Sequence, residues 1–289
     1  MNSEKNKVIA IVGPTASGKT AYSIELAKKL DGEIISADSR LVYKGFNIGT
    51  AKPTIEEREN IPHHMIDIVE PEINYSAGLY IKEAKKIINN ILKKGKTPIV
   101  VGGTGLYLNI LLMNFELPEV EPNYALREQL KKENNLHEIL KELDCETAKT
   151  IEPNDKKKLI RAIEIVKTTG KKLSEVRGIN ELEYNVEWHG RNFPRAELYD
   201  RINKRVDIML ETGLVEETKQ LLKKHGRINN ILYTIGYQEM VEYLDGTTTL
   251  EEATEKLKQN TRRYAKRQLT WFRKNEAINW NVYPETLKK

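Results

Sequence analysis

The sequence contains a single cysteine, Cys145, among 289 residues. One cysteine excludes an internal disulfide framework and a zinc site built from several thiolates, so we interpret Cys145 as a small packing residue. No apolar run approaches the roughly 20 residues of a transmembrane helix, and the first residues, MNSEKNK, lack the hydrophobic segment of a secretory signal. These absences predict a cytoplasmic protein with no membrane partner.

Charge is unevenly distributed along the chain. The net charge is +5, with 31% charged and 39% hydrophobic residues, which is typical of a globular protein. From Glu255 to Glu276 there is no acidic residue between the two ends, and three aromatic residues are interleaved with the cations Lys256, Lys258, Arg262, Arg263, Lys266, Arg267, Arg273 and Lys274. This run predicts a surface for a polyanion. The alternative is that its apolar residues form the buried side of an amphipathic helix, and we expect both descriptions to hold on different faces.

The first part of the chain alternates between strand and helix patterns. Apolar runs predict strands at 7–13, 32–38, 63–69 and 97–103, with helices at 18–30, from Ser76 to Gly95 and from Leu106 onward. Near-continuous apolar strands separated by helices predict an α/β fold with a parallel sheet flanked by helices.

The pattern changes after Pro118. Two helical runs between 124 and 170 predict an all-helical insertion, so we assign 1–117 and 191–289 to the core and 118–190 to the insertion. Further helices are expected at 196–213, 214–225, 236–244 and 249–274, the last with a Thr249 and Glu252 capping box. Residues 278–283 are expected to form a final strand.

Residues 13–20, GPTASGKT, fit the P-loop pattern G-x-x-x-x-G-K-[ST] and lie between a predicted strand and a predicted helix. Glycines let backbone N–H groups point at phosphate oxygens, Lys19 adds charge, and the Thr20 hydroxyl can bind Mg²⁺. A phosphate site in a P-loop NTPase-like sheet is therefore expected. A chance glycine turn is a poor alternative, because strand, motif and helix are in register.

P-loops usually hold ATP or GTP, but no second motif here identifies a nucleotide as the ligand. The chain has no N/TKxD guanine motif and no strand that ends in Asp-Glu. Asp38 instead ends the second predicted strand, at the sheet edge where ligands bind. It could be a helix cap or a carboxylate that supports a metal indirectly, or it could accept a proton from a nucleophile.

A second glycine cluster, 102-GGTGLYLN-109, ends the strand at 97–101. Its glycines permit close backbone approach and Thr104 can donate to a ligand, although a tight turn explains the cluster equally well. Arg201 and Arg205 share one helical face by their i, i+4 spacing. They are either solvated surface residues or phosphate ligands.

Eight blocks in order resemble tRNA dimethylallyltransferases, the bacterial family that prenylates N6 of adenosine 37 beside the anticodon. These blocks span Gly13 to Arg273: GPTASGKT, DSRLVYKGFNIGTAKP, IPHHMID, GGTGLYL, PNDKKKLIRAIEI, RINKRVDIMLETGLVEE, IGYQEM and TRRYAKRQLTWFR. The resemblance implies that the P-loop holds the diphosphate of dimethylallyl diphosphate. Consistent with this, the chain lacks the DDxxD run of helical prenyltransferases.

The resemblance also implies roles for individual residues. Asp38, Thr104 and Arg205 would be catalytic, with Asp38 accepting the N6 proton and Thr20 holding Mg²⁺. Diphosphate would be bound by Gly13, Pro14, Thr15, Ala16, Ser17, Gly18, Lys19, Thr20 and Arg201. The tRNA anticodon stem-loop would be bound by Asp38, Ser39, Arg40, Leu41, Lys157, Lys158, Arg161, Gly236, Tyr237, Arg263, Lys266 and Arg267.

The family commonly has glutamine where this chain has Leu41 and arginine where it has Gln238. We therefore expect changed base-reading contacts and an unchanged transfer chemistry. Two other activities remain open: prenyl transfer to a free adenine nucleotide, and ATP-dependent phosphorylation of a small alcohol. A helical insertion and a basic helix argue against the first, because a small acceptor needs neither. A monomer is expected, since no heptad pattern calls for a partner.

Overall fold

The computed structural model describes residues 6–115, 120–176 and 182–280, which form two compact units. The first unit contains residues 1–112 and 183–289, and the second contains residues 113–182. Among the described residues, no helix combines the length and the apolarity needed to cross a membrane.

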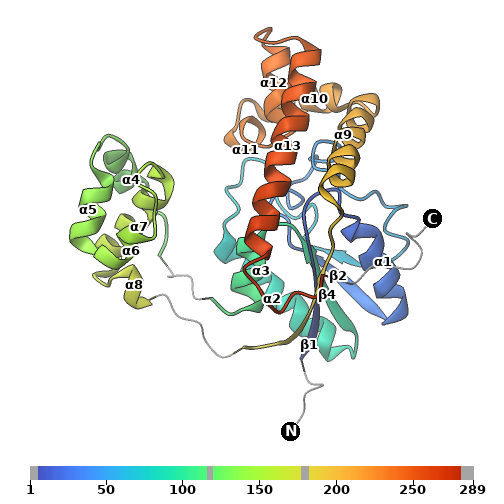
Figure 1. Ribbon diagram of the computed structural model, residues 1–289, viewed down its shortest axis with the longest axis horizontal. Helices are drawn as coiled ribbons and strands as arrows, with labels where there is room; N and C mark the ends of the chain where they lie inside the picture. The colour runs from blue at the N-terminus through green and yellow to red at the C-terminus, as the bar shows by residue number, and fades with distance from the viewer. Residues whose placement is uncertain (1–5, 116–119, 177–181, 281–289) are drawn as a thin grey trace. The chain divides into compact units, whose positions relative to one another are not determined.

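A five-stranded parallel sheet is the centre of the first unit (Figure 1). Its strand order is β3-β2-β4-β1-β5, with bounds Lys7–Val12 for β1, Gly32–Ser36 for β2, His63–His64 for β3, Thr97–Gly102 for β4 and Asn185–Gly190 for β5. The register pairs Ile9 of β1 with Ile99 of β4, which in turn pairs with Ile34 of β2. The predicted parallel α/β fold is confirmed.

Helices cover both faces of this sheet. Helix α1 (Lys19–Lys29) lies on one face, while α2 (Ala77–Lys93) and α3 (Gly105–Leu112) lie on the other (Figure 1). Ile24 and Ala27 of α1 pack on Ile9, Ile11 and Ile34, because alternate strand residues point to the same face. Ser76 caps α2 by accepting a hydrogen bond from the Leu79 amide, as predicted.

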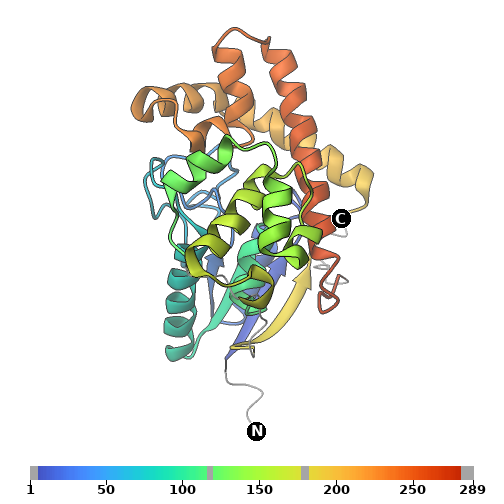
Figure 2. The ribbon, with the colours of Figure 1, turned by 90° about the vertical axis from the view of Figure 1, so that its left-hand side faces the viewer.

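Five further helices follow β5 in the chain. Their bounds are Arg195–Glu211 for α9, Leu214–His225 for α10, Asn229–Leu232 for α11, Tyr237–Leu244 for α12 and Leu250–Phe272 for α13. In both ribbon views α9, α10 and α12 lie beyond the carboxyl ends of the strands, and α13 extends from there along the sheet (Figures 1 and 2). The capping box predicted for α13 is present, with Thr249 and Glu252 satisfying each other's backbone amides.

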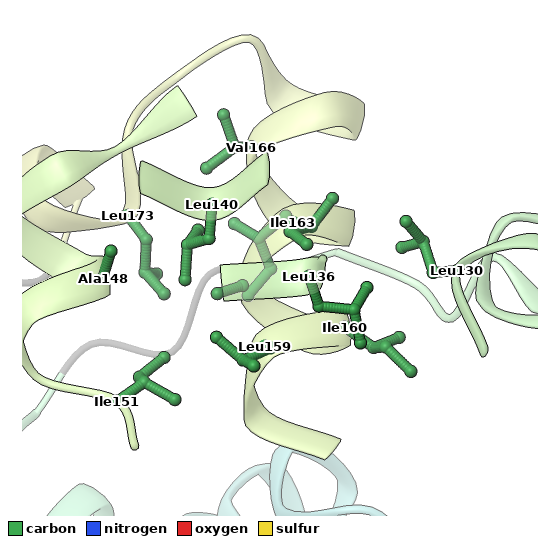
Figure 3. Packing of buried hydrophobic residues seen from close by; sticks show 12 residues of the cluster. Leu130, Leu136, Leu140, Ala148, Ile151, Leu159, Ile160, Ile163, Val166 and Leu173 are labelled. Atoms are coloured by element: carbon green, nitrogen blue, oxygen red, sulfur yellow. The ribbon is translucent and has the colours of Figure 1, made fainter. Parts of the chain in front are cut away.

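The second unit is a small helical bundle. Its helices are Tyr124–Lys131 (α4), Leu136–Leu143 (α5), Cys145–Lys149 (α6), Lys156–Thr169 (α7) and Leu173–Val176 (α8), so the segment is more finely divided than the two predicted runs. Leu140, Leu159 and Ile163 are each fully buried at the centre of its apolar core (Figure 3). This core is separate from that of the first unit.

Two polar networks fix the bundle. Glu164 is fully buried and receives two hydrogen bonds of 2.8 Å from Arg127, one of 2.5 Å from Arg161 and one of 2.7 Å from the Asn123 amide. Burial raises the pKa of Asp144, but hydrogen bonds from Thr147 and Ser174 outweigh it and hold that pKa at about 2. These carboxylates are therefore ionised at neutral pH.

Four sequence expectations need correction. Cys145 is exposed rather than packed in a core. The third strand is only two residues long rather than spanning 63–69. Of the final strand predicted at 278–283, the structure shows a single bridge from Asn279 to His189, and residues 281–283 lie outside the described residues. The sequence predicts an insertion that extends to residue 190, whereas residues 185–190 form β5 and pair with β1, so the compact unit ends at residue 182.

Candidate active site

The P-loop connects β1 to α1 at the carboxyl edge of the sheet. Gly13 has φ of 147°, and a Cβ added there would lie 2.0 Å from the carbonyl oxygen of Arg191, so only glycine fits. Gly18 has φ of 77° and is the N-cap of α1. The loop thus presents its backbone at the start of a helix, where the dipole favours an anion.

Cations gather around this loop. The Lys19 ammonium donates to the carbonyl oxygen of Pro14 at 2.6 Å, and Arg205 of α9 donates to the Thr15 hydroxyl at 3.2 Å. Burial lowers the pKa of Lys19, and the charge of Arg205 lowers it further. The Asp38 carboxylate raises this pKa, and the net result is a pKa of about 7. Burial and the neighbouring Arg201 also lower the pKa of Arg205. An anion bound here would relieve this crowding of positive charge.

The hydroxyl groups of Ser17 and Thr20 are positioned at the P-loop where they could bind a ligand. Ser17 is fully buried, and its Oγ has no hydrogen-bond partner among the described residues. Thr20, at the start of α1, is exposed and borders the same cavity. A buried hydroxyl without a partner is costly, so it favours a site that a polar ligand completes.

A carboxylate and a hydroxyl lie on the adjacent strand ends. Asp38 Oδ1 accepts hydrogen bonds from the amides of Arg40 at 2.8 Å and Leu41 at 3.4 Å. The Thr104 hydroxyl accepts one from the Ser39 amide at 3.1 Å. These bonds fix the Asp38 carboxylate in place while its Oδ2 accepts no hydrogen bond from the described residues.

One cavity of about 700 Å³ brings the P-loop, Asp38 and Arg205 together, whereas the predicted Thr104 is not among its lining residues. It is lined by the P-loop from Thr15 to Thr20, by Asp38, Ser39, Arg40 and Leu41, and by Arg205. A diphosphate group on the loop and an acceptor beside Asp38 would therefore share one cavity. The predicted Arg201 is not among the lining residues: its Nε donates to the Ala16 carbonyl at 3.0 Å, and its guanidinium lies 4.3 Å from the Phe193 ring. Arg201 supports the loop backbone.

Comparison with known proteins identifies the family. A family model described as IPP transferase matches residues 41–275. The chain belongs to this family. A tRNA dimethylallyltransferase from Pelotomaculum thermopropionicum is 46% identical over 291 residues, covering 97% of this chain and 92% of the relative. One from Alkaliphilus oremlandii is 48% identical over 286 residues, covering 96% and 91%.

Solved structures of IPP transferase relatives resemble this fold. The full-length tRNA isopentenylpyrophosphate transferase from Bacillus halodurans has a TM-score of 0.73 and 44% identity, covering 96% of this chain and 89% of that one. A eukaryotic dimethylallyltransferase acting on tRNA has a TM-score of 0.82 and 34% identity, covering 92% and 70%. The resemblance inferred from the sequence is confirmed.

The structure places the predicted RNA-binding residues in different environments. Arg263, Lys266 and Arg267 of α13 are exposed, and Arg267 also borders the cavity. Tyr237 is fully buried, with its hydroxyl donating to Glu217 at 2.8 Å, and the adjacent Gly236 is also buried. These two residues of the IPP transferase fold thus pack in the core rather than presenting a surface.

The second unit contains the other predicted RNA contacts. Lys157 and Lys158 are exposed on the first turn of α7, where Lys158 pairs with Asp155 at 2.6 Å. Arg161 instead binds the buried Glu164 and donates to the Val120 carbonyl at 2.9 Å. Its guanidinium therefore has an internal structural role.

Gln268, Tyr264 and His63 border the cavity but are not among the site residues that the sequence predicts. Gln268 of α13 bonds both to the P-loop and to the Gly103 turn. Burial and the nearby Asp38 raise the pKa of Tyr264, so its hydroxyl stays protonated. His63 Nδ1 lies 2.8 Å from the Ile61 carbonyl, and burial lowers its pKa, which favours the neutral form. Gln268 could have been noticed in the sequence, because it is a polar residue on the apolar face of the helix predicted at 249–274.

Proposed function

We propose that the protein transfers a dimethylallyl group from dimethylallyl diphosphate to N6 of adenosine 37 in tRNAs that read UNN codons, giving N6-isopentenyladenosine. The observation that carries the proposal is the placement of a cationic P-loop and the Asp38 carboxylate in one cavity. The relatives' names, tRNA dimethylallyltransferase, agree with it.

The leaving group is the diphosphate. In the transfer, the bond between the allylic carbon C1 and the diphosphate oxygen breaks, and its electron pair leaves with the diphosphate. Lys19 and Arg205 face the position where that negative charge grows. Because these groups are held in place before the reaction, they stabilise the developing charge with little reorganisation.

The nucleophile is the exocyclic N6 of adenine. Its lone pair forms the new bond to C1, and one of its two protons goes to Asp38. An exocyclic amine is a weak nucleophile, so removal of its proton during attack is worth about 10²- to 10⁴-fold in rate. The bonds from Arg40 and Leu41 hold Asp38 Oδ1, which leaves Oδ2 for the proton. Thr104 would act on this carboxylate through the neighbouring residue, because its hydroxyl accepts the bond from the Ser39 amide.

A magnesium ion would be held here by the Thr20 hydroxyl together with the bound diphosphate. Mg²⁺ commonly binds one or two protein oxygens together with substrate phosphates and water. The exposed Thr20 hydroxyl supplies such an oxygen at the cavity wall. No group of three or more His, Cys, Asp or Glu side chains able to hold a metal exists in the described parts of the chain. When bound, the ion would neutralise the charge of the departing diphosphate.

The tRNA would be held by separate positive surfaces. We propose that the exposed face of α13 and the lysines at the start of α7 contact the phosphate backbone of the anticodon stem-loop. Adenosine 37 must leave its stack to reach the cavity, at a cost of roughly a few kcal/mol that is smaller in a loop than in a duplex. We further propose that the protein works as a monomer in the cytoplasm, without membrane association.

The test compares acceptors under identical conditions. Dimethylallyl diphosphate with Mg²⁺ is incubated with unmodified tRNA, with AMP, or without acceptor, and nucleosides are analysed by mass spectrometry. A parallel reaction contains ATP and a panel of small alcohols. We expect N6-isopentenyladenosine only in tRNA. Product on AMP would instead indicate a free-nucleotide prenyltransferase, and phosphorylated alcohol would indicate a kinase.

A further inference from the structure

The buried amide of Gln268 joins two loops of the candidate active site. Its Oε1 accepts a hydrogen bond of 2.8 Å from the Thr15 amide of the P-loop. Its Nε2 donates one of 3.0 Å to the carbonyl oxygen of Gly103, next to Thr104. Gln268 is 6% exposed, so both bonds are shielded from water.

The fit around this side chain is tight. A Cβ added to Gly103 would lie 2.0 Å from Gln268 Nε2, so the glycine is what allows the amide to approach. Ala265, on the same helix, is fully buried against Leu198 and Ile202 of α9, which holds α13 at this depth. The position of Gln268 is thus determined by packing of the helix that carries it.

We infer that Gln268 is a positioning residue that sets the separation between the diphosphate-binding loop and the Thr104 turn. Prenyl transfer needs the leaving group and the nucleophile in line. In the proposed reaction the P-loop holds the leaving group, and the turn at Gly103 and Thr104 holds the segment of Asp38, the proposed proton acceptor, through the bond from the Ser39 amide to the Thr104 hydroxyl. Because a misplacement of about 1 Å can cost 10²-fold in rate, a link of fixed length between the loops favours transfer. This role rests on the proposed function.

The same contact changes the expected phosphate cradle. P-loop amides ordinarily point at phosphate oxygens, but the Thr15 N–H is already bonded to Gln268. Diphosphate would therefore rely on the amides from residue 16 onward, together with Lys19 and Arg205. Removal of the Gln268 amide would release the Thr15 N–H to the ligand, so diphosphate binding should survive while transfer slows.

The test uses Gln268→Met, which keeps the length of the side chain and removes both hydrogen bonds. Gln259→Met, at an exposed position of α13, is the matched control. We expect kcat for transfer to an anticodon stem-loop to fall about 10- to 100-fold in Gln268→Met. The Kd for inorganic diphosphate should change less than about threefold. A kcat within twofold of wild type, or parallel losses in kcat and diphosphate binding, would overturn the proposal.

A second variant, Gly103→Ala, changes the other partner of the hydrogen bond between Gln268 and Gly103. Gly103→Ala pushes the Gln268 amide away from the Gly103 carbonyl, so its effect on kcat and that of Gln268→Met should not be additive. Additive effects would show that the two positions act separately. Hydrogen exchange at the Thr15 amide tests the contact without any activity: we expect at least about tenfold faster exchange in Gln268→Met than in Gln259→Met. Unchanged exchange would refute the link even if the proposed function failed.

Discussion

Binding of a diphosphate to this protein should take up a proton. In the free protein the pKa of Lys19 is about 7, because burial and Arg205 disfavour its charged form more than Asp38 favours it. A bound diphosphate would place negative charge beside the ammonium and raise that pKa. Lys19 would then become fully protonated in the complex throughout the neutral range.

The size of this effect follows from the pKa of the free protein. With a pKa of about 7, Lys19 is about 10% protonated at pH 8 and about 90% protonated at pH 6. Binding should therefore take up roughly 0.9 proton at pH 8 and roughly 0.1 at pH 6 through this residue. The contribution of Lys19 to affinity should be constant below pH 7 and decline above it, giving an affinity about tenfold weaker at pH 8 than at pH 6.

Calorimetry in buffers of different ionisation enthalpy measures this uptake directly. The diphosphate titrates as well, so its own protonation is measured separately and subtracted. Lys19→Arg is the matched variant, because guanidinium stays charged over this range. After this subtraction, we expect diphosphate affinity to be about tenfold weaker at pH 8 than at pH 6 in the wild type, and unchanged in Lys19→Arg. The same pH dependence in both proteins, or no proton uptake at pH 8 in wild type, would refute the reasoning about Lys19.

Three further predictions concern other residues. Asp38→Asn should lower kcat about 10²- to 10⁴-fold with little change in diphosphate Kd, as measured by single-turnover transfer and calorimetry; a loss below tenfold would contradict its role as proton acceptor. Arg205→Met should weaken inorganic diphosphate binding by about 10- to 100-fold, the value of one charge-assisted hydrogen bond, whereas Arg195→Met, at an exposed position, should not. Asp144, whose pKa is lowered from 3.8 to about 2, should stabilise the second unit by about 2 kcal/mol above pH 4, a contribution lost as the pH falls toward 2. Urea unfolding of Asp144→Asn against wild type at pH 7 and at pH 2.5 checks this, and an equal difference at both pH values would contradict it.

Local sequence was sufficient for the P-loop and for the helix caps. Gly13, Gly18 and Lys19 belong to one short segment whose spacing reports directly on its backbone. Ser76 and Thr249 satisfy amides only three residues away, so their roles can also be predicted without tertiary information.

Other features depend on distant parts of the chain. Gln268 lies 253 residues from Thr15, and no local pattern predicts that contact. β5 is difficult to recognise in the sequence because its first half is partly exposed at the edge of the sheet, which weakens its apolar pattern. Tyr237 was expected at an RNA surface, but its burial depends on packing against Phe46, with ring centroids 4.8 Å apart.

The proposed function requires that the P-loop bind a leaving diphosphate and that the acceptor be RNA. Its most direct test is the stoichiometry of a single turnover, in which the released diphosphate and the prenylated adenosine are counted together. Wild-type protein with dimethylallyl diphosphate and an anticodon stem-loop containing adenosine 37 should release one diphosphate per modified base, and none when guanosine replaces that adenosine. Diphosphate released equally from both stem-loops, or no modified base in either, would contradict the account.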